Sequence, residues 1–342
     1  MHTEHDLPWL AEPLRTLRDD QTGHALIVHG GMGSGLLALV LRAAQTWLCE
    51  RPPGPCGQCA SCQLVQAHTH PDLKVLMPET WQHRLNWGQP EAEGGGEADG
   101  DSRSKKKPSR EIKVEAVRQA IDWAHTSSGR NRGKVLVIFP ADAMNTVSAN
   151  ALLKTLEEPG QGVRLLLAVQ DPAQLLPTIL SRCQRLRLSP PDEAQALRWL
   201  QAQGLQDAAQ LLRAASGEPL AAIELAGQGV SGASWADLPR QVARGDGHQL
   251  ASWPVPQALQ TLQQLCHDWM TVACGGTPRF FPPESLPKGA DLAALVAWSQ
   301  ELARVRRHDE HPWQAPLLLE ALLAQAQALF SGAPKATARR YT

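Results

Sequence analysis

Short unbroken runs of apolar residues recur through the first half of the chain. They occupy positions 25–28, 135–139 and 165–169, and they are rich in branched side chains. Runs of this length and composition are typical of strands that are buried on both faces of a parallel sheet. Strand-like patterns at 72–76 and at 186–188 extend the series. The first half of the chain is therefore predicted to form a parallel sheet.

Apolar stripes with helical spacing lie between these runs. One stripe places apolar residues at i, i+3, i+4 and i+7, and its members are Ala149, Leu152, Leu153 and Leu156. The sequence Glu-Glu-Pro-Gly at 157–160 then ends that helix. A second stripe runs from Val114 to Ala124. Strands that alternate with helices indicate an α/β domain in which helices flank the sheet.

The pattern changes after Pro190 and Pro191, where strands stop and only helical stripes remain. We expect an α/β domain over 1–189 and a small helical domain over 190–228. A segment rich in Gly, Ser, Arg and Asp then predicts a linker that contains one short helix. We expect this linker to cover 229–252. A C-terminal helical domain is then predicted over 253–330, followed by a flexible tail over 331–342.

One internal segment has no apolar periodicity. Residues 88–109 combine three consecutive glycines and several acidic residues with Lys105, Lys106 and Lys107. Such a composition buries too little apolar surface to fold, and it predicts a disordered insertion. The lysine run is a candidate contact for DNA, but a solvated linker whose charges neutralise one another is the favoured interpretation.

Length and charge limit the possible functions. A chain of 342 residues is expected to form two or three domains. Its formal net charge is −1, so any contact with DNA is predicted to be local or to be made by partners. Residues 1–10 contain no long apolar run, and no segment approaches the roughly 18 apolar residues of a membrane span. We therefore expect a soluble, cytoplasmic protein.

Four of the seven cysteines cluster within one short segment, with the spacing C-x6-C-x2-C-x2-C: Cys49, Cys56, Cys59 and Cys62. In a reducing compartment, four such thiolates predict a closed tetrahedral shell around structural Zn²⁺ rather than disulfides. An iron–sulfur cluster and a set of unligated thiols are the alternatives. His68 and His70 lie nearby, but we expect them to be surface residues that do not bind the metal.

The first apolar run leads directly into a glycine-rich loop. Gly30 and Gly35, with Gly33 between them, match the two fixed glycines of the G-x-x-x-x-G-K-[ST] pattern that holds nucleotide phosphates, but Leu36 and Leu37 stand where the Lys and Ser/Thr belong. The loop therefore lacks the charge and the Mg²⁺ ligand of a working site, and we expect no productive ATP binding. A glycine turn unrelated to nucleotides is the alternative, and non-productive nucleotide binding remains open.

Two longer motifs carry a resemblance to a known family. The runs NALLKTLEEP at 150–159 and TILSRC at 178–183 resemble bacterial clamp-loader subunits of the AAA+ class. The resemblance implies an AAA+ P-loop-type domain with an inserted zinc knuckle at 49–62, followed by a helical lid and an all-α collar domain. In active relatives one strand ends in Asp-Glu, which holds Mg²⁺ and orients the attacking water. Phe139 and Pro140 hold those places here, and Asp142 comes two residues too late to replace them.

Within this family the chain resembles the δ′-type branch, which does not hydrolyse ATP. The resemblance implies a role in the DNA polymerase III holoenzyme, a DNA-directed DNA polymerase, together with the γ/τ ATPase subunits and δ. The complex places the sliding clamp on primer-template DNA. Arg182, between Ser181 and Cys183, would supply an arginine finger to a neighbouring subunit's ATP. The alternative for Arg182 is an ion pair within its own domain. An active ATPase subunit and a free-standing zinc nucleic-acid-binding module are the alternatives for the whole chain.

Overall fold

The computed structural model describes most of the chain, in the ranges 7–19, 23–87, 108–307 and 314–330. The chain divides into two compact units, one ending at Pro191 and the other beginning at Asp192. This division falls close to the change of pattern at Pro190. Among the described residues, no helix is both long and apolar enough to cross a membrane.

Two predicted segments fall almost entirely outside the described residues. These are the disordered insertion at 88–109, with its lysine run, and the tail at 331–342. At the end of the insertion, however, Ser109 is described and is held in place. Its N–H donates to the carboxylate of Glu79 at 2.9 Å, and its carbonyl accepts from the N–H of Thr80 at 3.1 Å. The ordered chain therefore resumes before Arg110.

The first unit is built on a five-stranded sheet in which all neighbouring strands are parallel, in the order β2-β3-β4-β1-β5. Its strands are β1 (Ala25–Gly30), β2 (Leu73–Leu76), β3 (Lys134–Ile138), β4 (Val163–Val169) and β5 (Gln184–Leu188). The central strand β1 pairs Ile27 with Leu167 of β4 on one side and with Arg185 of β5 on the other. This arrangement confirms the predicted parallel α/β class.

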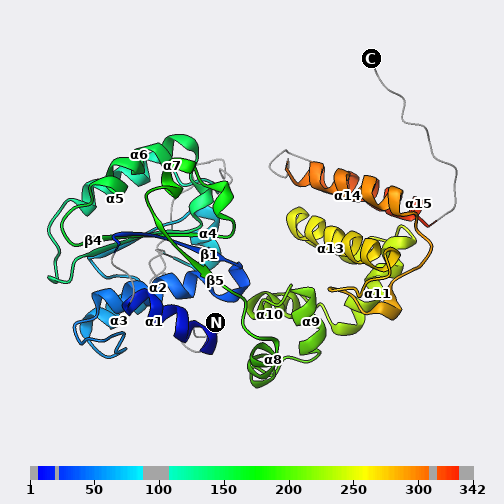
Figure 1. Ribbon diagram of the computed structural model, residues 1–342, viewed down its shortest axis with the longest axis horizontal. Coiled ribbons are helices and arrows are strands. Elements are labelled where there is room, and N and C mark those ends of the chain that lie inside the picture. The colour runs from blue at the N-terminus through cyan, green and yellow to red at the C-terminus, as the bar shows by residue number, and fades with distance from the viewer. Residues whose placement is uncertain (1–6, 20–22, 88–107, 308–313, 331–342) are drawn as a thin grey trace, which may run out of the picture. The chain divides into compact units, whose positions relative to one another are not determined.

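Helices cover both faces of the sheet (Figure 1). The helices of this unit are α1 (Ala11–Asp19), α2 (Leu36–Leu48), α3 (Ala60–Gln66), α4 (Glu79–Leu85), α5 (Val114–Ala124), α6 (Thr146–Glu157) and α7 (Pro177–Leu180). On one face, α5 and α6 bury side chains such as Val117 and Leu152 against Ile27 and Leu136 of the sheet. The opposite face carries α2, which begins directly after the glycine loop. Because all strands are parallel, the segments after β1, β3 and β4 meet at one edge of the sheet.

The second unit is entirely helical among its described residues. Its helices are α8 (Glu193–Ala202), α9 (Ala208–Ala214), α10 (Pro219–Gly227), α11 (Gly232–Ala243), α12 (His248–Ala251), α13 (Val255–Ala273), α14 (Leu292–Arg306) and α15 (Ala315–Ala328). The predicted helix start at Asp192 is present, since its carboxylate accepts from the N–H of Gln195 at 3.3 Å. Leu200, Leu262 and Leu302 belong to one continuous core. The segments predicted to be a separate lid and collar therefore share a hydrophobic core.

The predicted linker at 229–252 differs from expectation. It contains α11, twelve residues long, and Trp235, Leu238 and Val242 of this helix are buried in the shared core. The Gly and Ser residues that suggested a linker lie at the helix ends, where Ser231 forms a capping box. Between the helix ends, the buried side chains follow a helical spacing, so α11 is an ordered helix that packs into the core.

Candidate metal centre, glycine loop and surface arginine

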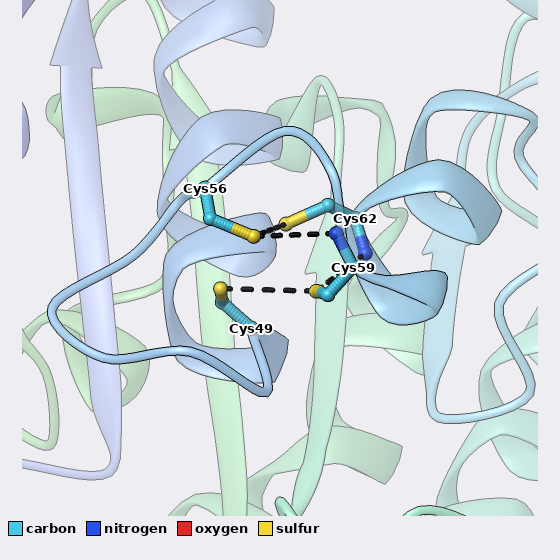
Figure 2. Close-up of side chains that lie close together, drawn as sticks. All are labelled: Cys49, Cys56, Cys59 and Cys62. Carbon is cyan, nitrogen blue, oxygen red and sulfur yellow. Dashed lines mark hydrogen bonds between the residues drawn. The ribbon is translucent and has the colours of Figure 1, made fainter.

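The four clustered cysteines converge on one point. Cys49 ends α2, Cys59 caps α3, Cys62 lies in the first turn of α3, and Cys56 lies in the intervening loop. All four Sγ atoms lie within 4.8 Å of one another, and Figure 2 shows the side chains pointing inward. The sulfurs of Cys49 and Cys59, and those of Cys56 and Cys62, are 3.9 Å apart. A tetrahedral ion with bonds of about 2.3 Å needs sulfurs about 3.8 Å apart, so the residues fit one metal ion.

Backbone groups favour the thiolate form of two of these cysteines. The N–H groups of Gln58 and Cys59 lower the pKa of Cys56 to about 6. Burial acts to raise the pKa of Cys59, but backbone N–H groups of Cys62 and Glu50 outweigh it, and the pKa of Cys59 is lowered. Burial raises the pKa of Cys62 to about 12. A thiolate at Cys62 is therefore costly unless a cation neutralises it, as a bound metal ion does.

The two nearby histidines differ from each other. His68 is exposed, and its ring stacks on Trp87 with centroids 3.6 Å apart. His70 was expected at the surface, but only 4% of it is exposed. Its Nδ1 accepts from the N–H of Asp72 at 3.0 Å, and its Nε2 contacts Ser61 Oγ at 3.0 Å. Both ring nitrogens are engaged, so His70 is not free to bind a metal, and burial lowers its pKa.

The glycine loop requires glycine for steric reasons. A Cβ at Gly30 would lie 2.3 Å from the carbonyl oxygen of Leu188 on β5. Gly35 has a φ of +89°, and a Cβ there would lie 2.7 Å from Leu7. Gly33 is buried in the turn between them. The three predicted glycines thus shape a tight connection between β1 and α2.

Two N–H groups of the loop are used within the loop itself. Residues Met32–Ser34 form a 3-10 turn, in which Ser34 donates to Gly31 at 3.1 Å and Gly35 donates to Met32 at 3.2 Å. In a working phosphate loop, backbone N–H groups point at the ligand and a lysine reaches the phosphates. Leu36 stands at the lysine position and is 0% exposed. The loop therefore lacks the charge of a phosphate site, and two of its N–H donors are already engaged.

An N-terminal segment that the sequence did not single out covers this loop. Leu7 and Leu10 are buried beside Gly35, and the indole N–H of Trp9 donates to the carbonyl of Ser34 at 2.8 Å. The short turn η1 (Pro8–Leu10) positions these side chains. No local signal predicted this contact, because it joins residues about 25 positions apart.

The positions of the missing acidic pair are apolar in the structure as well. Phe139 is buried at the end of β3, and its ring meets Trp81 of α4 edge to face, with centroids 4.9 Å apart. Pro140 is buried next to it. Asp142 follows in a separate turn, η3 (Ala141–Ala143). No carboxylate stands at the two positions that would hold Mg²⁺ and orient water.

Arg182 lies at the surface, between α7 and β5. It forms an ion pair with Glu157 at the end of α6, and its Nε donates to that carboxylate at 2.6 Å. Its Nη1 also donates to the carbonyl of Thr178 at 2.9 Å. Ser181 Oγ donates to the same carbonyl at 3.1 Å, while burial raises the pKa of Cys183 to about 11. The chain by itself therefore shows the pairing within one domain that was the alternative for Arg182.

Comparison of the chain with known proteins identifies its family. A family model described as "DNA polymerase III, delta subunit" matches residues 11–192. The DNA polymerase III subunit delta′ of Pseudomonas aeruginosa is 37% identical over 257 residues, which are 73% of this chain and 70% of that protein. The chain belongs to the DNA polymerase III δ′ subunit family. The δ′ subunit of Yersinia pestis is 31% identical over 95% of this chain and 96% of its own length.

Similarity to other subunits of the same polymerase is less extensive. The τ subunit of Escherichia coli is 32% identical over 194 residues, but these are 56% of this chain and 25% of that protein. The δ′ subunit of Escherichia coli matches 92% of this chain at 31% identity. Membership of the δ′ family therefore extends into the helical unit, and the resemblance read from the two sequence motifs is confirmed.

Proposed function

We propose that this chain is a non-hydrolysing δ′-type subunit of a bacterial clamp loader, which helps to place the sliding clamp on primed DNA. Similarity to δ′ subunits along nearly the whole chain, 95% of it for the Yersinia pestis protein, carries the proposal. In this role the chain acts in the cytoplasm as part of a DNA-directed DNA polymerase holoenzyme. It contributes to a reaction that other subunits catalyse.

The proposed lack of ATPase activity is supported by two independent positions. Leu36 occupies the lysine position in a loop whose turn uses its own N–H groups. Phe139 occupies the place of the Mg²⁺ ligand and packs against Trp81. Phosphoryl transfer depends on positioned charge around the phosphates, and neither position provides any. An active ATPase subunit, the alternative, would need both.

We propose Zn²⁺ as the ion of the cysteine cluster. The sulfurs are close enough for a single ion, and thiolate ligands in a tetrahedron are the usual zinc set. A cluster of several irons would hold its ligands farther apart. Four protein ligands close the coordination shell, so the zinc would stabilise residues 49–62 and would have no open position for catalysis.

Arg182 is proposed to act on the ATP of a neighbouring subunit. Its ion pair with Glu157 does not contradict this role, because the two side chains are 33% and 50% exposed. An ion pair this exposed contributes at most about 1 kcal/mol. A triphosphate in a drier interface offers more negative charge and suits the planar guanidinium. Arg182 could therefore exchange Glu157 for the phosphate at little cost.

Partner subunits are supported by the exposed apolar side chains of the helical unit. Leu292 and Val296 of α14 are both 42% exposed, and Leu317 of α15 is 59% exposed. Isolated exposed apolar side chains are ordinary, but Leu292 and Val296 lie about one turn apart on α14, and adjacent exposed apolar side chains are typical of an interface. We propose that this surface packs against other clamp-loader subunits, namely the γ/τ ATPase subunits and δ. Contact with the clamp and with primer-template DNA would be made through the complex.

The proposal is tested by reconstitution. The purified chain should co-elute with the ATPase subunits and δ in size-exclusion chromatography, and the complex should load clamps onto primed DNA only when the chain is present. A Leu292→Glu, Leu317→Glu double variant should elute alone, whereas Arg118→Glu, in the other unit, should still assemble. Elution of the unaltered chain by itself, together with binding to DNA, would support the free-standing zinc module instead.

A further inference from the structure

A closed ring of hydrogen bonds joins the cysteine cluster to the sheet. Its members are Glu50, Ser61, His70, Asp72 and Arg130. They come from four separate segments: the end of α2, helix α3, the approach to β2 and the loop before β3. Two of the members adjoin predicted metal ligands, because Glu50 follows Cys49 and Ser61 precedes Cys62.

The direction of the bonds is fixed around the ring. The N–H of Asp72 donates to Nδ1 of His70, so the proton of the neutral imidazole lies on Nε2 and is donated to Ser61 Oγ. Ser61 in turn donates its hydroxyl proton to the carboxylate of Glu50 at 3.1 Å. Ser61 Oγ accepts from His70 and donates to Glu50, so every donor in this part of the ring meets an acceptor.

Arg130 closes the ring. Its Nε donates to Glu50 Oε1 at 2.8 Å and contacts Ser61 Oγ at 3.1 Å, while Nη2 pairs with the same Glu50 oxygen. Its backbone N–H donates to Asp72 at 2.9 Å. The carboxylate of Asp72 also accepts from the N–H of Gly129 at 2.7 Å. The loop before β3 is thus held from the sheet side, and its arginine reaches across to the cysteine segment.

We propose that Arg130 is a positioning residue for the cysteine cluster, holding segment 49–62 against the start of β2 and β3 so that the four thiols stay assembled. The inference goes beyond the proposed clamp-loader role, and its consequence for metal retention rests on the proposed zinc site. Groups that orient metal ligands need no contact with the ion, and here the ring acts through the peptide bonds that join Glu50 to Cys49 and Ser61 to Cys62.

Arg130 is expected to affect the cluster more than the stability of the whole chain. Arg130 and Glu50 have side chains that are 32% and 34% exposed, so solvent screens the pair and the ion pair alone contributes little to stability. Loss of a group that orients metal ligands, in contrast, weakens metal binding by about 10- to 100-fold. A structural role limited to the surface ion pair would not produce an effect of that size on the metal.

The experiment uses the full-length chain loaded with Zn²⁺ and a chromogenic chelator as competitor. Arg130→Ala should bind Zn²⁺ about 10- to 100-fold more weakly than the unaltered chain. The zinc affinity of Arg130→Lys should fall between these two, because an ammonium lacks the planar fork with which the guanidinium contacts both Glu50 and Ser61. Arg132→Ala, an exposed arginine in the same loop that is not a ring member, should match the unaltered chain.

A second measurement does not depend on the metal. In the metal-free chain, a thiol reagent should modify the cysteines of segment 49–62 faster in Arg130→Ala than in Arg132→Ala. Ser61→Ala, which removes the shared hydroxyl, should behave like Arg130→Ala in both measurements. If Arg130→Ala keeps both the zinc affinity and the thiol reactivity of the unaltered chain, the positioning role is wrong. If the unaltered chain binds no zinc, the zinc proposal fails, and the thiol measurement alone decides the role of Arg130.

Discussion

The glycine loop and the cysteine cluster lie at opposite ends of one helix, α2, and they differ in what their residues provide. At the N-terminal end, Gly35 has the left-handed backbone of the turn before the helix, but Leu36 fills the charged position and is buried. At the C-terminal end, Cys49 and its three partners bring four thiols close enough for one metal ion. A matching glycine spacing therefore does not make a site by itself, and the side chains decide whether its chemistry is possible.

The cysteine end should respond most strongly to mutation. Cys62→Ser should abolish binding of one Zn²⁺ per chain and loosen residues 49–62, because structural zinc sites contribute about 10–16 kcal/mol of apparent binding energy near neutral pH. Elemental analysis and amide hydrogen exchange measure the two effects. Cys274→Ser is the matched control, because Cys274 is exposed and lies in the other unit. Retention of a full zinc equivalent by Cys62→Ser would contradict the four-cysteine site.

The second-largest effect is expected at Arg182, whose positive charge is proposed to act in the ATP site of a neighbouring subunit. Arg182→Ala should reduce the ATPase rate and the clamp loading of the reconstituted complex. Arginine fingers contribute about 10³- to 10⁵-fold in GTPases, and a complex with several ATP sites should lose less. Arg182→Lys should not restore the rate fully, because it lacks the planar fork.

The control for this prediction is the internal partner of the arginine. Glu157→Gln breaks the ion pair seen in the chain alone, and the complex should keep its ATPase rate. If Arg182→Ala also assembles and loads clamps at the unaltered rate, the motif at 181–183 is only structural. If Glu157→Gln instead reduces the rate as much as Arg182→Ala, the ion pair itself is what the complex needs.

At the glycine end of α2, restoring only the lysine of the phosphate-loop pattern should not restore ATP hydrolysis. Leu36→Lys should lower the free energy of unfolding by about 3–5 kcal/mol, because it leaves an uncompensated charge at a fully buried position. Denaturant titration of the full chain measures this change. Neither this variant nor the unaltered chain should release phosphate from ATP above the buffer rate. A stable Leu36→Lys variant that hydrolyses ATP would show that the loop had retained a working shape.

The smallest predicted effect tests the cover over that loop. Trp9→Phe keeps an aromatic ring but removes the indole N–H that donates to Ser34, and it should cost about 1 kcal/mol of stability. Trp47→Phe is the matched control. Its buried indole N–H has no hydrogen-bond partner in the described part of the chain, so that variant should lose less. Equal losses in denaturant titration would indicate that ring packing, and not the hydrogen bond, holds the segment.

Sequence reasoning succeeded where the relevant residues are close together in the chain. The four cysteines span fourteen positions, and β1, β3 and β4 contain continuous apolar runs, so local spacing predicted both the convergence of the cysteines and the parallel sheet. It failed at long range. Arg130 lies 80 positions from Glu50, and no periodicity connects them. His70 was expected at the surface, but it is 4% exposed and its ring nitrogens bond to Ser61 and Asp72.

The helical unit shows a second reason for failure. Composition marked 229–252 as a linker, yet Trp235 of this segment is 1% exposed. The flanking glycines and serines made the composition of this segment resemble a linker. Whether a helix packs into a core, however, depends on the spacing of its few apolar side chains. The role of Arg182 toward a partner stays a prediction, because a single chain shows only the contact with Glu157 that is available without a partner.

The strand order also determines when the first unit can fold during synthesis. Strand β1 emerges from the ribosome early, but Ala25 pairs with Leu165 and Leu26 pairs with Gln184, so both of its neighbours are made much later. At about 5–20 residues per second, β1 waits many seconds with both edges unpaired. The four cysteines of the proposed zinc site lie within fourteen residues, and Arg130, which is proposed to hold them, is also made before β4 and β5. The proposed zinc site can therefore assemble before the sheet, which closes only after β5 has been synthesised.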